Sequence, residues 1–316
     1  MFPQQSNMLV HKLMNGFLRC RSIFTSPRQR ISSIAQEDTS KIMQRFKRIS
    51  NNPPRLSNSG TRQEFDIPGF PFSDFTRTGS LGIWNLLKSL EIFRGSVDAE
   101  GTKSDRNIIT VLTSQSLEVS PELYQKAAII RPMTVVQRPG YLGKTSLTIF
   151  IELMDAETGA MYAINTRQLV SIDIVNRKTV PLREEFQKLK ELADPDAKPL
   201  FIPEWKPLTE TLTYNFKVQH SDTDQFYHTN QSVYVRLCMN AAANACNDGK
   251  LKNFTGDFFR YDVSSALMRY LGESFPGDDL EVTLWEDDLE LDSLFFQIHK
   301  SNTPIYTAKF TCSPSE

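Results

Sequence analysis

One order of elements occurs twice in this chain of 316 residues, and the repeat constrains the fold more than any other feature. In each copy a short segment with aromatic residues leads to a polar loop, which we call the elbow, and then to a helical run and extended segments. The helical runs cover residues 81–93 and 233–245, with apolar residues three or four apart. The extended segments after the first run cover residues 108–119, 133–136, 145–153 and 160–174, and are rich in Val, Ile, Thr and aromatic residues.

A hairpin also recurs. Residues 149–153 and 161–163 flank one turn, residues 293–298 and 305–308 flank another, and Tyr162 and Tyr306 stand just after the two turns. Matching places of helix and hairpin favour a duplication over chance similarity between β-rich sequences. We therefore predict an α+β fold in which each copy packs a long helix on a mostly antiparallel sheet.

The boundaries of the copies follow from composition. Residues 1–62 form an extension and linker, residues 63–184 the first unit and residues 211–316 the second. Between the units, residues 185–210 combine a short charged helix with a connector in which Pro195, Pro199, Pro203 and Pro207 are evenly spaced. Proline at this density excludes a helix, so the connector is predicted to cross the surface in an extended form.

The densest polar segment of the chain is the second elbow, His220 to Tyr234, which reads HSDTDQFYHTNQSVY. It lies between an extended run at residues 212–218 and a helix predicted to begin near Gln231. Loops held by a rigid scaffold can present side chains and free helix N–H groups together, so this elbow is the predicted functional site.

Composition excludes several classes of function. The net charge is −1, with 36 basic and 37 acidic residues, so no global field favours nucleic acid or an anionic membrane as a partner. Cys20, Cys238, Cys246 and Cys312 show no CxxC spacing and are predicted to be reduced thiols, mostly buried, in an intracellular protein. The longest apolar stretches, such as residues 146–154, are too short to span a bilayer, so no stable membrane insertion is predicted.

The amino-terminal 36 residues contain no acidic residue, and five basic residues are interleaved there with serines and large apolar residues. A helix over residues 8–21 would place Leu9, Leu13 and Phe17 on one stripe. This composition is typical of a mitochondrial transit peptide and predicts a location in the matrix. The alternative is a basic tail without a targeting role on a cytoplasmic protein.

The second elbow resembles the second-repeat active-site motif of the acyl-carrier-protein thioesterases, a family with the hotdog fold. The family pattern runs Asp-x-Asp-x-Asn-x-His-x-Asn and is followed by a helix with an aromatic residue. On this chain Asp222 and Asp224 match the acids, His228 the histidine, Asn230 the last asparagine and Tyr234 the helix aromatic. Residues 143–159 and 168–182 also resemble the final strands of hotdog thioesterases, so the resemblance covers residues 65–316.

The resemblance implies a tandem (double) hotdog and hydrolysis of acyl thioesters. It places Asp224, His228 and a later glutamate, Glu273, in the catalytic site, and Asn230, Phe226 and Tyr234 against the substrate. The family's catalytic asparagine falls on Phe226, so that amide is missing here. The first elbow carries Asp74 without a histidine or second acid, and would be the degenerate copy that shapes the acyl tunnel.

The chemistry agrees with this role. Thioester hydrolysis needs an activated water and a hold on the carbonyl oxygen as it gains charge. Asp224 is suited to orient or deprotonate the water, and His228 to share the proton or hold the carboxylate. The N–H groups that open the following helix can bind the oxyanion. No cofactor or metal is required.

Other interpretations of the elbow remain open. Asp222 and Asn230 suit turn or helix-cap roles, and the elbow could be purely structural. The residues His220, Asp222, Asp224 and His228 have metal-ligand chemistry, but no further anchor with zinc-like spacing follows. No GxSxG motif marks a serine nucleophile. A hydratase of the same fold resembles Gly-Asp-x-Asn-Pro-x-His, and the Gly, Asn and Pro are missing here.

Two hypotheses about function follow. The first is a thioesterase that acts on acyl-carrier-protein or coenzyme A thioesters. The second, prompted by Phe226, is a catalytically weakened protein that binds acyl thioesters or acts as a scaffold. Either way the predicted partners are an acyl thioester and, where it is the carrier, acyl carrier protein. A duplicated chain is also a pseudo-dimer by itself, and pairing into a homodimer stays open.

Overall fold

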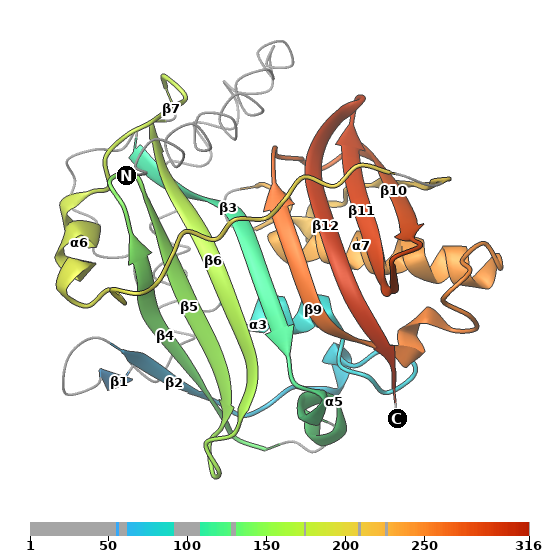
Figure 1. The fold of residues 1–316 in the computed structure, drawn as a ribbon, viewed down its shortest axis with the longest axis horizontal. Helices are drawn as coiled ribbons and strands as arrows, with labels where there is room; N and C mark the ends of the chain where they lie inside the picture. Colours follow the sequence, from blue (N-terminus) through green and yellow to red (C-terminus); the bar gives the residue numbers. More distant parts are fainter. Residues whose placement is uncertain are drawn as a thin grey trace.

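The computed structural model describes residues 55–56, 62–91, 108–127, 131–173, 175–207, 210–224 and 227–315. Within these ranges 12 strands form one antiparallel sheet (Figure 1). The order across it is β1-β2-β4-β5-β6-β3-β9-β12-β11-β10-β8, and β7 pairs with β6. The α+β class with a mostly antiparallel sheet is confirmed.

The two halves of the sheet have the same plan. From the outside inwards, β2-β4-β5-β6-β3 matches β8-β10-β11-β12-β9, and the halves join where β3 pairs with β9. The first half contains β1 Arg55–Leu56, β2 Gln63–Ile67, β3 Ile108–Val119, β4 Met133–Leu142, β5 Ser146–Asp155, β6 Met161–Asp173 and β7 Lys178–Thr179. The second half contains β8 Leu212–Lys217, β9 Tyr261–Tyr270, β10 Asp279–Asp287, β11 Glu290–Lys300 and β12 Thr303–Pro314.

The long helix of the second half, α7, spans Gln231–Asn247. The Asn230 side chain caps it by accepting a hydrogen bond from the Ser232 N–H. Small residues at its centre are fully buried and let it lie close to β8 and β10, behind the sheet in Figure 1. The predicted helix at residues 233–245 is present and extends by about half a turn at each end.

The helix of the first half is shorter than predicted. It is α3, Ile83–Ser89, in place of a run over residues 81–93. Leu81 precedes the helix because it forms a β-bridge with Phe75, and Gly82 supplies no side-chain cap. Residues 92 and 93 lie outside the described ranges. α3 packs against α7, so both helices lie on one side of the sheet.

The connector crosses the opposite side of the sheet, where Figure 1 shows it as a yellow trace in front of the strands. It follows α6, Glu184–Gln187, and the 3-10 turn η2, Lys188–Glu191. Trp205 lies edge-on to Phe295 of β11, with ring centroids 5.9 Å apart, and Ile202 is buried. The proline-rich segment is thus a strap over the sheet. The remaining short helices are α5, Pro121–Ala127, and the 3-10 turns η1 Phe72–Asp74, η3 His220–Asp222 and η4 Phe258–Arg260.

Three of the cysteines fall in the described ranges. Cys238, Cys246 and Cys312 are free and buried, as predicted, and Cys20 lies outside those ranges. Burial raises the pKa of the Cys246 thiol to about 11. Among the described residues no helix is both long and apolar enough to cross a membrane. The transit peptide predicted for the amino-terminal extension also lies outside them and stays a prediction.

Candidate active site

The second elbow forms a tight loop between η3 and α7. Thr223 and Thr229 form a β-bridge across its base, and the Asp224 N–H donates to the His228 carbonyl at 2.8 Å. Tyr227 adopts a positive φ of 62° at the turn. The backbone therefore holds the two predicted catalytic residues, Asp224 and His228, opposite one another. Phe226 lies outside the described residues.

His228 meets the third predicted catalytic residue. Its Nδ1 lies 3.7 Å from Glu273 Oε1, and the two side chains are 39% and 41% exposed. The His228 ring also stands perpendicular to Phe275, with centroids 5.2 Å apart. The imidazole thus contacts a carboxylate and an aromatic ring while about two fifths of the side chain stays exposed. This pairing of distant segments was predicted only through the family resemblance.

The segment that carries Glu273 is fixed from the interior by Ser274. The Tyr234 hydroxyl accepts a hydrogen bond from the Ser274 N–H at 3.1 Å and lies 3.0 Å from its Oγ. Thr229 donates its N–H and its hydroxyl to the Ser274 carbonyl, at 2.9 and 3.0 Å. Ser274 is fully buried. It holds the loop and the glutamate segment together.

Tyr234 was predicted to contact substrate, and the structure places it in the core. It is 3% exposed and stacks on Tyr306, with centroids 5.3 Å apart. Burial raises its pKa to about 12, so the hydroxyl is neutral at physiological pH. The Tyr234 hydroxyl contacts Ser274, next to Glu273. Ser274 itself was not predicted, because an isolated serine in an extended run carries no local signal.

Asn230 was also predicted to contact substrate, and its polar atoms are engaged by the protein. Oδ1 accepts from the Ser232 N–H at 2.8 Å and from the Ser232 hydroxyl at 2.6 Å. Nδ2 donates to Glu91 Oε2 at 2.6 Å. Asn230 is therefore the helix cap that the sequence also suggested, and it ties α7 to the segment after α3.

Asp222 has a structural role. Its Oδ1 pairs with the Arg236 guanidinium at 2.5 Å, its Oδ2 accepts from the Gln219 N–H, and its carbonyl accepts from the Asn230 N–H. The turn role expected from the sequence is confirmed. Asp222 is one of the four residues considered above as metal ligands, and these bonds already engage both of its carboxylate oxygens. No group of three His, Cys, Asp or Glu side chains suited to a metal occurs in the part of the chain that the structure describes.

The start of α7 retains one N–H group for a ligand. Asn230 takes the N–H groups of Ser232 and Val233, whereas the Gln231 N–H bonds to none of the described residues. The positive end of the helix dipole adds to its attraction for negative charge. Of the N–H groups that the sequence suggested as oxyanion donors, that of Gln231 is the one without a partner among the described residues.

The first elbow has the same backbone. In the first elbow η1 takes the place of η3, and the Phe75–Leu81 bridge takes the place of the Thr223–Thr229 bridge. The Thr76 N–H donates to the Ser80 carbonyl at 2.8 Å, as the Asp224 N–H does to the His228 carbonyl. Gly79, with φ of 87°, takes the place of Tyr227. Thr76 and Ser80 thus stand where the second elbow has Asp224 and His228.

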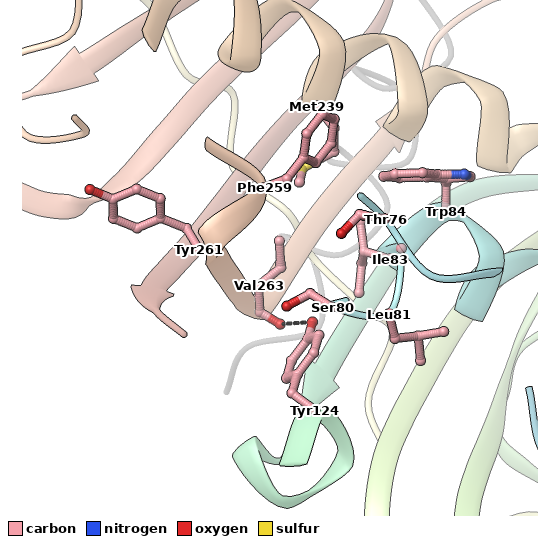
Figure 2. A pocket seen from close by; sticks show the side chains of 11 residues that line it. Thr76, Ser80, Leu81, Ile83, Trp84, Tyr124, Met239, Phe259, Tyr261 and Val263 are labelled. Carbon is pink, nitrogen blue, oxygen red and sulfur yellow. Dashed lines mark hydrogen bonds between the residues drawn. The ribbon is translucent and has the colours of Figure 1, made fainter. Parts of the chain in front are cut away.

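The side chains of the first elbow bind the second half of the molecule. Ser80 donates to Asp262 at 2.9 Å, Thr78 donates to the Phe259 carbonyl at 2.6 Å, and Arg77 pairs with Asp257 at 2.7 Å. Figure 2 shows the small cleft that remains there. Its volume is about 10 Å³, room for about one water molecule. The first elbow is therefore a closed interface with the second half. The tunnel-shaping role expected for it from the sequence stays a prediction.

The fold is that of known thioesterases. An acyl-ACP thioesterase from Bacteroides thetaiotaomicron VPI-5482 superposes with a TM-score of 0.62 at 15% identity, covering 82% of this chain and 100% of that chain. A 12:0-ACP thioesterase from Umbellularia californica superposes with a TM-score of 0.60 at 13% identity, covering 80% and 97%. The chain therefore has the hotdog-like fold of the acyl-ACP thioesterases. At this identity the likeness establishes the fold alone.

Comparison by sequence adds nothing to this result. No protein-family model matches the chain, and no curated protein matches it.

Proposed function

We propose that this protein, which has the fold of the acyl-ACP thioesterases, hydrolyses acyl thioesters. The observation that carries the proposal is the meeting of His228 and Glu273 beside the amino terminus of α7, across the elbow from Asp224. The thiol part of the substrate is acyl carrier protein or coenzyme A. In this proposal the two halves act as two hotdog units, with the first elbow as the inactive copy.

The reaction needs no group beyond the chain and a water molecule. Asp224 accepts a proton from the water, whose oxygen attacks the thioester carbonyl carbon. The Gln231 N–H and the helix dipole stabilise the oxyanion. The carbon–sulfur bond then breaks, and His228, oriented by Glu273, gives a proton to the leaving sulfur. The products are a carboxylic acid and a free thiol. The proton that Asp224 took from the water then passes to His228, and both side chains regain their starting protonation states.

The test is thiol release by the purified full-length protein on a panel of acyl thioesters of acyl carrier protein and coenzyme A. Asp224→Asn should lower turnover at least about 100-fold, the usual contribution of a general base. Asp279→Asn is the matched control, because Asp279 is an exposed carboxylate on β10 paired with Lys217. Full turnover in Asp224→Asn would show that the roles are wrong, and no release by the wild type would reject the function.

The second candidate is a protein that binds acyl thioesters without cleaving them. It is favoured by Phe226, which stands where the family has an amide. It predicts saturable binding of a long acyl thioester with thiol release no faster than in buffer. The same panel decides between the two, because turnover well above background contradicts this candidate.

A further inference from the structure

A line of polar side chains crosses the interior of the sheet on the side that faces the helices. Four adjacent central strands each contribute one, namely Tyr306 of β12, Tyr270 of β9, Gln115 of β3 and Asn165 of β6. All four are buried, with exposed fractions of 0 to 8%. We call these four residues the interior polar row. An interior built only for an alkyl chain would be apolar, because each buried polar group costs free energy unless it is hydrogen-bonded.

The row begins beneath the candidate active site. Tyr306 stacks on Tyr234, whose hydroxyl fixes the Ser274 segment next to Glu273. Tyr270 lies edge-on to Tyr306, with centroids 5.3 Å apart. Tyr234, Tyr306 and Tyr270 thus form a continuous set of ring contacts from the Ser274 segment into the row.

The hydrogen bonds of the row have a direction. Tyr270 donates to Gln115 Oε1 at 2.7 Å, and Gln115 Nε2 donates to Asn165 Oδ1 at 2.9 Å. Asn165 Nδ2 is then left as a buried donor with no acceptor among the described residues. Leaving such a donor unmatched costs about 1 to 3 kcal/mol.

An acceptor without a donor lies near the same row. Glu91 uses Oε2 to bind the Asn230 side chain, and its Oε1 is buried with no partner among the described residues. Burial raises the pKa of Tyr270, and the charge of the Glu91 carboxylate raises it further. Arg167, two residues beyond Asn165 on the same face of β6, donates to the Leu90 carbonyl at 3.4 Å. The interior thus presents an unmatched donor, Asn165 Nδ2, and an unmatched acceptor, Glu91 Oε1. The Tyr306 hydroxyl of the row also has no partner among the described residues.

We propose that this interior binds an acyl chain that carries a hydroxyl group, so that the preferred substrate is a hydroxyacyl thioester. A hydroxyl both accepts and donates hydrogen bonds, so it can accept from Asn165 Nδ2 or donate to Glu91 Oε1. An unsubstituted alkyl chain matches neither and leaves both buried groups unsatisfied. The inference rests on the proposed function for the turnover of the thioester, and on the interior polar row alone for the choice of acyl chain.

The first measurement is kcat/KM of the full-length protein on thioesters of one chain length, unsubstituted or with the hydroxyl moved along the chain. At least one hydroxyacyl thioester should exceed the unsubstituted one about tenfold, the value of one buried hydrogen bond. Asn165→Leu should remove most of this preference. Gln168→Leu is the matched control, since Gln168 is a buried amide on the same strand that faces the connector and accepts from the Leu200 N–H.

The preference should survive Gln168→Leu within about twofold, because no bond of the row is altered. Gln115→Met is the second variant if Asn165→Leu does not fold, because it removes the amide that fixes the orientation of Asn165. A wild type that prefers the unsubstituted chain, or an equal change of preference in the Asn165 and Gln168 variants, would overturn the inference.

Thermal stabilisation by free fatty acids separates this inference from the proposed function, since it needs no turnover. A hydroxy acid should raise the Tm of the wild type more than the unsubstituted acid of the same length, and the difference should vanish in Asn165→Leu. If that holds while no thioester is cleaved, the interior binds hydroxyacyl chains and the proposed function is wrong. If thioesters are cleaved and the two acids stabilise the protein equally, the proposed function stands and the preference for hydroxyacyl chains is wrong.

Discussion

The two elbows of this protein have one backbone and opposite surroundings. In the first, Ser80 and Thr78 donate to Asp262 and to the Phe259 carbonyl, so the polar atoms are consumed by the second half. In the second, His228 and Glu273 meet with about two fifths of each side chain exposed. The backbone of the elbow is thus a common scaffold, and the side chains at two positions distinguish the closed interface from the candidate site.

The largest expected effect lies at the position that Ser80 and His228 share. His228→Ala should lower thioester turnover at least about 100-fold, because it removes the proposed proton donor to the leaving sulfur. Ser80→Ala is the matched change in the first elbow and should leave turnover within about threefold. Steady-state thiol release measures both. Equal losses in the two variants would mean that the elbows do not differ in chemistry.

A smaller effect on turnover is expected at Tyr234, the α7 residue that packs in the core. Tyr234→Phe leaves the buried Ser274 N–H without its acceptor and should cost about 1 to 3 kcal/mol of unfolding free energy. Turnover should also fall several-fold, because the Glu273 segment loses its anchor. The matched position on α3 is Leu86, which is 1% exposed and belongs to the hydrophobic core.

Leu86→Met is therefore the control, and it should cost less than about 1.5 kcal/mol and leave turnover unchanged. Denaturant unfolding and thiol release on both variants give the comparison. A Tyr234→Phe protein with wild-type stability and turnover would show that the Ser274 segment is held by other contacts.

The smallest effect concerns the two hairpins. Tyr162 donates to Asp155 at 2.6 Å, and this bond, with those from the Thr158 and Glu157 N–H groups, holds the Asp155 pKa below its usual value. A carboxyl whose pKa is lower in the folded state stabilises the protein above its unfolded pKa of about 4, and this contribution is lost as the pH falls further. Tyr162→Phe should therefore lower the denaturation midpoint at pH 7 and flatten its fall below pH 4.

Tyr306 stands at the matching place in the second hairpin, and its hydroxyl has no partner among the described residues. Tyr306→Phe should leave both the midpoint and its pH dependence nearly unchanged, since no bond is broken. Denaturation midpoints from pH 2 to 7 measure the contrast. An equal loss in the two variants would show that the Tyr162 bond to Asp155 contributes nothing specific.

Much of the fold was predictable because its signals are local. The strand over residues 108–119 was predicted to the residue, and the second helix to within about half a turn at each end, because β-branched runs and a capping asparagine act within a few positions. The short α3 was not predicted. Leu81 continues the helical spacing, but its pairing with Phe75 removes it from the helix, and that pairing depends on the turn between them.

The site was predictable only in part. Asp224 and His228 stand close in sequence, so one loop brings them together, whereas Glu273 could be placed only through a resemblance. Ser274 carried no signal, because its role depends on contacts with Thr229 and Tyr234 from another part of the chain. Tyr234 and Asn230 were predicted to face substrate, since the sequence shows which residue types stand near a site but not which way they point.

The repeat, the class of fold and the elbow in which ionisable groups gather follow from the sequence alone, because hydrophobic periodicity and turn residues act over short distances. The closure of the first elbow against Asp262, the meeting of Glu273 with His228 and the polar row in the interior are visible only in the folded molecule. These contacts join residues far apart in the chain, and their geometry depends on how the two half-sheets pair at β3 and β9.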